Sequence, residues 1–140
     1  MSRSTTAWQV HLGEARTMAY DRSNVFARIL RGELPCERVY EDEHALAFRD
    51  INPLAPLHVL VIPKGEYASM DDFSRDAPPE AIASFFRAVG ETARRLGVAE
   101  SGYRFLANTG ADGNQEVMHF HVHIFGGAPL GRMLKKVAAS

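Results

Sequence analysis

The chain has 140 residues and a mass of 15.5 kDa, which fits one domain of ordinary size. Apolar residues make up 46% and charged residues 24%, the balance of a soluble globular domain that can bury a core without disulfide support. Sixteen basic and seventeen acidic residues leave a net charge of −1, which argues against a nucleic-acid partner bound through its phosphates. Cys36 is the single cysteine, so an internal disulfide and a zinc site built on several thiolates are excluded.

Residues 1–22 have no periodic pattern and are predicted to be an N-terminal extension of a domain spanning residues 23–140. Met18 is an alternative natural start, because the organised pattern begins just after it. No stretch approaches the ~20 consecutive apolar residues of a membrane span, and the N-terminus lacks the apolar core of a signal peptide. We therefore expect a cytoplasmic protein without a membrane partner, in which the lone thiol stays reduced.

The first predicted elements are a short helix and three strands. The helix covers Ser23–Arg31, and Gly32 supplies its C-terminal stop. The strands are expected at Val39–Glu41, Ala45–Asp50 and His58–Ile62, because these runs are short, rich in apolar residues and bounded by turn residues.

The second half of the chain predicts one long helix and two more strands. Lys64–Arg75 is expected to be a loop with about one helical turn, and apolar residues at helical spacing predict a helix over Pro78–Leu96. Strands follow at Tyr103–Asn108 and Val117–Phe125. The pattern predicts an α+β domain with two helices on an antiparallel sheet of about five strands.

The last strand alternates histidine with apolar residues. His119, His121 and His123 project from one face, and the apolar residues between them project from the other. A polar sheet face that happens to use histidine is the simplest interpretation, but it fits three imidazoles in register poorly. A metal site is a second interpretation, with His58 and Asp50 as further donors. Nucleophilic catalysis is the third, since neutral imidazole attacks phosphorus near neutral pH.

The turn-rich segment just before this strand favours the third interpretation. Asn108–Asn114 contains two glycines, which allow backbone N–H groups to converge on an anion. Such loops are usually plain turns, so this signal depends on its position beside the histidines.

The run His119–Phe125 resembles the His-φ-His-φ-His-φ-φ signature of the histidine triad family, where φ is apolar. The resemblance, to the bacterial-type Hint-like branch, extends over about Asn24–Leu134. Its other motifs are Asn24–Pro35, Phe48–Lys64, Gly113–Met118, Gly126-Gly127 and Pro129–Gly131. It implies a HIT-like fold.

The resemblance implies roles for four histidines. His121 would be the nucleophile that attacks the α-phosphorus, and the carbonyl of His119 would orient its second ring nitrogen. The His119 ring would be a buried support. His123 would contact the phosphate on the leaving-group side, and His58 would belong to a supporting proton network. His11 and His44 have no assigned role.

The resemblance also implies a nucleotide pocket. The expected base-binding residues are Phe26, Ile29, Leu34 and Phe48, the ribose would bind Asp50 beside Ile51, and Asn108, Asn114, Glu116 and Val117 would surround the phosphate oxygens. Without the resemblance, the aromatic residues would be interpreted as core and Asp50 as a turn cap.

Three positions depart from the family pattern. Asn114 stands where glycine is commonest, which puts the shape of the phosphate loop in question. Glu116 stands where the eukaryotic branch has serine, and its carboxylate would disfavour anionic leaving groups. Ala128 replaces a common arginine.

The sequence thus predicts a nucleotidyl hydrolase that cleaves purine nucleoside phosphoramidates or aminoacyl-adenylates through a nucleotidyl-histidine, with no metal or other cofactor. Alternatives are a dinucleoside polyphosphate hydrolase, a nucleotide-binding regulatory module with incidental catalysis, and a His-x-His metalloprotein. The resemblance further implies a homodimer with continuous sheets. The helix Pro78–Leu96 would contact the partner, and Leu130–Ser140 would reach its site.

Overall fold

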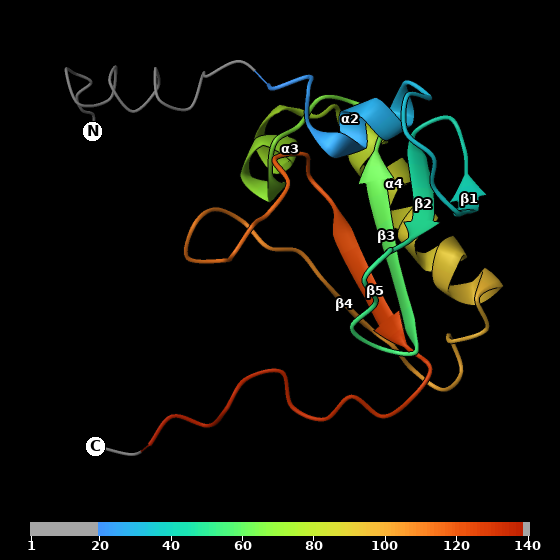
Figure 1. The fold of residues 1–140 in the computed structure, drawn as a ribbon, viewed down its shortest axis with the longest axis vertical. Helices are drawn as coiled ribbons and strands as arrows, with labels where there is room; N and C mark the ends of the chain where they lie inside the picture. The colour runs from blue at the N-terminus through green and yellow to red at the C-terminus, as the bar shows by residue number, and fades with distance from the viewer. Residues whose placement is uncertain (1–19, 139–140) are drawn as a thin grey trace.

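The computed structural model describes residues 20–138 and places three helices around one five-stranded sheet in them (Figure 1). Most of the expected extension, including Met18, lies outside the described residues, so the domain boundary at residue 23 stays a prediction. No helix within residues 20–138 is long and apolar enough to cross a membrane.

The sheet has the strand order β1-β2-β3-β5-β4, and every neighbouring pair is antiparallel. The predicted antiparallel five-stranded architecture is therefore confirmed. The elements in chain order are α2 (Val25–Leu30), β1 (Arg38–Glu41), β2 (Ala45–Arg49), β3 (Leu57–Pro63), α3 (Met70–Asp76), α4 (Pro79–Arg95), β4 (Arg104–Leu106) and β5 (Val122–Gly126). In Figure 1, α4 lies behind the sheet and α2 lies across its upper end.

Three elements differ from their prediction, and one of them is β4, which covers only Arg104–Leu106 of the strand predicted over Tyr103–Asn108. Where one helical turn was expected, α3 has seven residues, because Ser69 caps the amide of Asp72 and acidic residues occupy the first turn. The strand predicted from Val117 begins only at Val122. Its expected partner β3 ends at Pro63, whose carbonyl bonds to the His119 ring instead.

The sheet is covered on both faces, which explains why β2 and β3 are almost continuously apolar. On one face Ala47 and Val61 pack with α4 and with the aromatic cluster of Phe73, Phe85 and Phe120. The other face packs against α2 through a second cluster, which consists of Phe26, Ile29, Leu46, Phe48, Leu60 and Ile62. The strands β3 and β5, which carry histidines, are thus packed between two apolar clusters.

Candidate active site

The histidines converge because β3 and β5 are neighbours. Their register pairs His58 with Phe125 and Leu60 with His123. Since directly opposed residues of an antiparallel pair share a face, His58 and His123 lie on the α2 side of the sheet. His121 also packs there, with its ring centroid 4.9 Å from that of Phe26 and 5.1 Å from that of His123.

His119 is fully buried behind His121. Its Nε2 lies 2.8 Å from the carbonyl oxygen of Pro63, and its Nδ1 is hydrogen-bonded to the hydroxyl of Tyr20. A carbonyl only accepts, so Nε2 carries the proton and Nδ1 accepts from the phenol. Burial lowers the pKa of His119 to about 4, which keeps the ring neutral at pH 7.

The ring of His121 is held by the backbone of its neighbour. Nδ1 of His121 donates to the carbonyl oxygen of His119 at 2.7 Å, which leaves the lone pair on Nε2. Burial lowers the pKa of His121, so this lone pair is unprotonated near neutral pH. Within residues 20–138, no hydrogen bond occupies Nε2. A neutral imidazole with one free nitrogen is competent as a nucleophile.

A backbone amide sets the tautomer of His123 through His58. The N–H of Leu54 donates to Nδ1 of His58 at 3.1 Å, so the proton of the neutral His58 ring is on Nε2. That proton is donated to Nδ1 of His123 across 2.9 Å. His123 therefore carries its own proton on Nε2, and this buried N–H has no acceptor among the described residues. A buried donor of this kind matches a ligand oxygen.

The electrostatics agree with this assignment. Burial, helped by the neighbouring rings of His121 and His58, lowers the pKa of His123 to about 4. Burial also lowers the pKa of His58, against the opposing effect of Asp50. All four rings are therefore neutral at pH 7, and each has one protonated nitrogen.

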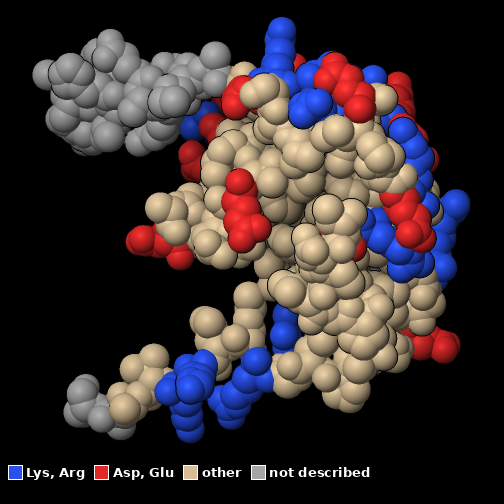
Figure 2. All heavy atoms as spheres, in the orientation of Figure 1, with Lys and Arg blue, Asp and Glu red and all other residues tan. Residues whose placement is uncertain are grey.

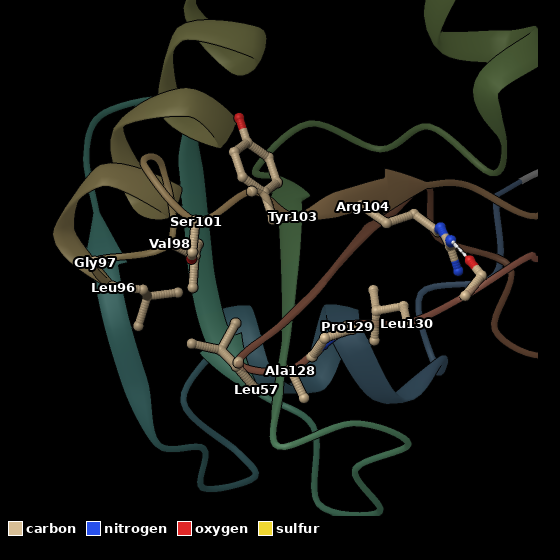
Figure 3. A pocket seen from close by; sticks show the side chains of 13 residues that line it. Leu57, Leu96, Gly97, Val98, Ser101, Tyr103, Arg104, Ala128, Pro129 and Leu130 are labelled. Atoms are coloured by element: carbon tan, nitrogen blue, oxygen red, sulfur yellow. Dashed lines mark hydrogen bonds between the residues drawn. The ribbon is translucent and has the colours of Figure 1, made fainter.

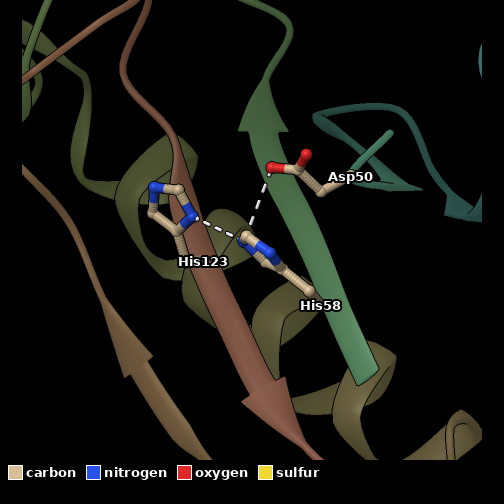
Figure 4. Close-up of side chains that lie close together, drawn as sticks. All are labelled: Asp50, His58 and His123. Carbon is tan, nitrogen blue, oxygen red and sulfur yellow. Dashed lines mark hydrogen bonds and ion pairs between the residues drawn. The ribbon is translucent and has the colours of Figure 1, made fainter. Parts of the chain in front are cut away.

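Asp50, His58 and His123 offer three donor atoms that all lie within 4.8 Å of one another (Figure 4). This cluster is the geometric basis of the metal hypothesis. However, the Leu54 amide places the proton of His58 on the nitrogen that would have to face the ion. Ligation would require that hydrogen bond to break, so the donor set favours a hydrogen-bonded pair over a metal site.

The candidate side chains surround one pocket of about 540 Å³. Predicted residues that line it are Phe26, Ile29, Leu34, Phe48, Asp50, Ile51, Asn108, Asn114, Glu116, Val117, His121 and His123. His58 and His119 are not among its lining residues. Ile51 stands at the rim with 89% of its surface exposed. Cys36, Leu54 and Leu60 also line the pocket, and the sequence analysis assigned them no role in it.

The loop that borders the pocket has a defined backbone. Asn114 adopts φ 59°, the left-handed region that glycine prefers and asparagine tolerates. This conformation explains how asparagine can replace the commoner glycine. Gln115 fastens the loop, because its side-chain amide donates to the carbonyl of Ala68 at 2.6 Å and its carbonyl accepts from the amide of Gly110 at 3.0 Å. The same amide also donates to the carbonyl of Val117 at 3.0 Å. Sequence reasoning assigned Gln115 no role, since all three of its side-chain partners are backbone groups.

A second cleft, of about 830 Å³, lies between the α4–β4 connection and the segment after β5 (Figure 3). Its lining includes Leu57, Val98, Tyr103 and Leu130, and Arg104 hydrogen-bonds to the carbonyl of Gly131 across it. No histidine or carboxylate lines this cleft, so its side chains offer no base that would activate a nucleophile. All the predicted site residues that line a pocket in the described part of the chain line the smaller one.

Comparison with known proteins agrees with the geometry. The HIT domain family model matches residues 31–130. A HIT-like protein from Azospirillum brasilense is 64% identical over 117 residues, which cover 84% of this chain and 96% of that protein. Purine nucleoside phosphoramidase from Escherichia coli is 42% identical over 110 residues, covering 79% and 92%.

Solved structures give the same result. A HIT family hydrolase from Clostridium thermocellum superposes with a TM-score of 0.75 at 38% identity, covering 81% of this chain and 99% of that one. A histidine triad nucleotide-binding protein from Candida albicans has a TM-score of 0.67 at 27% identity, with 83% and 87% covered. A pocket lined by neutral histidines on a five-stranded antiparallel sheet is the arrangement expected of a histidine triad protein. The chain belongs to the HIT domain family.

The buried neutral histidines predict that acid destabilises the fold. Their folded-state pKa values lie below the ordinary value near 6.5, so between about pH 6.5 and pH 4 the unfolded chain binds protons that the folded chain does not. The free energy of unfolding should therefore fall as pH falls through this window, by roughly 1.4 kcal/mol per pH unit for each histidine that stays neutral. Urea unfolding at a series of pH values measures the slope. A histidine-ring NMR titration with His119 and His123 charging near pH 6.5 would contradict the assignment.

Proposed function

We propose that the protein is a nucleotidyl hydrolase that cleaves purine nucleoside phosphoramidates or aminoacyl-adenylates. One observation carries the proposal: the same pocket holds a buried, neutral His121 with a free Nε2 lone pair and a buried His123 N–H without an acceptor. A free nucleophile beside a free donor is the arrangement that substitution at a phosphoryl group needs.

The pocket divides into an apolar end and a polar end. Phe26 and Phe48 meet edge to face with centroids 5.6 Å apart, and Ile29 and Leu34 complete an apolar slot that suits a flat purine. Asp50 stands between this slot and the histidines, and its Oδ1 accepts from the amide of Asn52 at 2.8 Å. A carboxylate held in that way is suited to accept hydrogen bonds from ribose hydroxyls.

The proposed reaction has two displacements. The Nε2 lone pair of His121 attacks the α-phosphorus as the bond from phosphorus to the amine nitrogen breaks, and this nitrogen takes a proton from solvent water and leaves as the amine. With an aminoacyl-adenylate, the bond from phosphorus to the acyl oxygen breaks instead, and the carboxylate leaves without a proton. The His121 ring then carries positive charge, which strengthens the hydrogen bond from its Nδ1 to the His119 carbonyl. Water next attacks phosphorus and breaks its bond to Nε2, which releases the nucleoside monophosphate and restores the neutral ring. The His123 N–H would stabilise phosphoryl oxygen charge in both steps.

Charge around the pocket favours this substrate class over dinucleoside polyphosphates. Among the described lining residues, Arg49 is the one Lys or Arg, and its guanidinium pairs with Glu37 at 3.0 Å. Asp50 and Glu116 add two carboxylates to the same lining. A chain of several phosphates would meet little positive charge there, whereas a single phosphoryl group bearing an amine needs little.

Replacement of His121 by alanine should abolish amine release from an adenosine 5′-phosphoramidate, because the attacking nitrogen is removed. Nucleotide binding should persist, since the apolar slot and Asp50 are untouched. Amine release by chromatography and AMP binding by calorimetry measure the two effects, and rapid quench with intact-protein mass spectrometry should find an adenylylated wild type.

The matched control is His44→Ala, which removes an imidazole outside the pocket and should keep full turnover. Full turnover by His121→Ala would refute the mechanism. Binding without turnover by the wild type would instead favour a regulatory nucleotide-binding module, and activity lost on chelation would favour a metalloprotein.

Glu116→Gln should relax leaving-group selectivity, because it removes the exposed carboxylate whose charge also acts on His121. We expect kcat/KM for dinucleoside polyphosphates and other anionic leaving groups to rise up to about fivefold, while the value for an uncharged amine leaving group changes less than about twofold. Parallel kinetics on both substrates check this. Glu80→Gln on α4 is the charge-matched control, and an equal change for both substrates in Glu116→Gln would count against a role in selectivity.

We also propose that two copies pair through β4. This strand is an edge of the sheet, its Phe105 is 53% exposed, and Phe86 of α4 is exposed as well. An edge strand with exposed aromatic side chains suits antiparallel addition of an identical strand, which would make the two sheets continuous.

The C-terminal segment leaves the body of the domain (Figure 1) and carries the exposed cations Arg132, Lys135 and Lys136, grouped at the lower left of Figure 2. It is therefore available to a partner copy.

Phe105→Glu should convert the dimer to a monomer, because two like charges would face each other across the new strand pair. Sedimentation velocity of the wild type and the variant measures the mass. Met70→Glu, at a comparably exposed apolar position on α3, should remain dimeric. A monomeric wild type would overturn this assembly.

A further inference from the structure

One hydroxyl contacts the triad from outside the predicted domain. Tyr20, which precedes α2, is hydrogen-bonded to Nδ1 of His119, and the two rings meet edge to face with centroids 5.6 Å apart. Sequence reasoning placed this residue in an extension without a role. Burial raises the pKa of Tyr20 above its ordinary value near 10, so the phenol keeps the proton that it donates.

The backbone that carries Tyr20 is fastened to the domain. The guanidinium of Arg22 pairs with Glu66 at 2.9 Å, and the guanidinium of Arg31 donates to the carbonyl of Arg22 at 2.7 Å. The side-chain amide of Asn24, the N-cap of α2, donates to the carbonyl of Asp21 at 2.8 Å. These contacts fasten the segment before α2 to the domain, and so they hold Tyr20 beside His119.

The Pro63 carbonyl decides which tautomer His119 adopts, and the Tyr20 hydroxyl occupies the nitrogen that this tautomer leaves without a proton. With the proton on Nε2, the ring donates to the Pro63 carbonyl and accepts from Tyr20. With the proton on Nδ1, the Nε2 lone pair would face the Pro63 carbonyl, and two acceptors would be opposed in a fully buried site. The Pro63 oxygen therefore selects the tautomer, and the Tyr20 hydroxyl holds the ring from its opposite side by donating to Nδ1.

The same residue holds the nucleophile. The backbone carbonyl of His119 accepts the Nδ1 proton of His121, so the orientation of His121 follows the position of the His119 main chain. That main chain lies outside the sheet ladder, because β5 begins only at Val122. The amide of the same peptide unit, that of Phe120, donates to the carbonyl of Tyr67 at 2.7 Å, and the side chain of His119, held at both nitrogens, is the second anchor of this carbonyl.

We propose that Tyr20 is a positioning residue for the reaction: its hydroxyl locks the buried His119 ring, and the His119 carbonyl in turn orients His121. The kinetic part of this inference rests on the proposed hydrolase function, whereas the ring lock itself does not.

The test is Tyr20→Phe, which keeps the aromatic ring and removes the hydroxyl. We expect the ¹⁵N signal of His119 Nδ1 to move to that of a nitrogen without a hydrogen bond, and kcat to fall about fivefold, with KM unchanged. The matched control is Tyr40→Phe, which removes a phenol of the edge strand β1 that donates to Asp42 at 2.9 Å and, within the described residues, has no contact with the triad. It should leave both readouts at wild-type values.

An unchanged His119 signal in Tyr20→Phe would overturn the lock. A raised KM with unchanged kcat, or an equal loss of kcat in Tyr40→Phe, would overturn the positioning role. If Tyr20→Phe does not fold, an NMR cross-peak between the Tyr20 hydroxyl proton and the His119 ring in the wild type decides the lock, and its absence refutes it. The NMR readouts need no substrate, so a wild type that cleaves no phosphoramidate would refute the proposed function alone.

Discussion

The structure depends on one constraint: buried imidazoles must be neutral, and each of their nitrogens needs a partner. His119 meets it with the Tyr20 hydroxyl and the Pro63 carbonyl, and His58 meets it with the Leu54 amide and His123. The partners impose a single tautomer on every ring. What is left over is one free lone pair on His121 and one free N–H on His123, and both residues line the same pocket. The two groups that we propose take part in the reaction are thus those that the hydrogen-bonding network of residues 20–138 leaves without a partner.

Packing on both faces of the sheet holds the histidine rings in the positions that this constraint requires. Packing against α4 on one face and α2 on the other fixes β3 and β5, so that the rings at positions 58, 121 and 123 have little freedom to rotate. Burial also lowers the pKa of each ring, which removes the positive charge that would otherwise repel its neighbours. The apolar core and the polar site are therefore parts of one arrangement, and the pocket is preorganised before any ligand arrives.

Much of the fold follows from local pattern. The alternation around His121 and the spacing along α4 predict the strand and the long helix because side-chain periodicity reflects which face is buried. The start of β5 and the length of α3 do not follow, since one depends on the pairing with β3 stopping at Val61 and Val122, and the other on a cap at Ser69. Local sequence predicts the face that a residue occupies far better than where pairing with a distant strand ends.

The sequence by itself determined the three imidazoles in register, the central apolar strands and, through resemblance, the residues that surround the pocket. Tertiary structure alone decided the tautomers, because the groups that set them are backbone atoms of Leu54 and Pro63. The phenol that completes the His119 site lies 99 residues away from it in the sequence. Backbone amides and carbonyls are the same at every position, so no sequence pattern marks the ones that matter. Their effect exists only once the chain has folded and a distant ring has been brought within hydrogen-bonding distance.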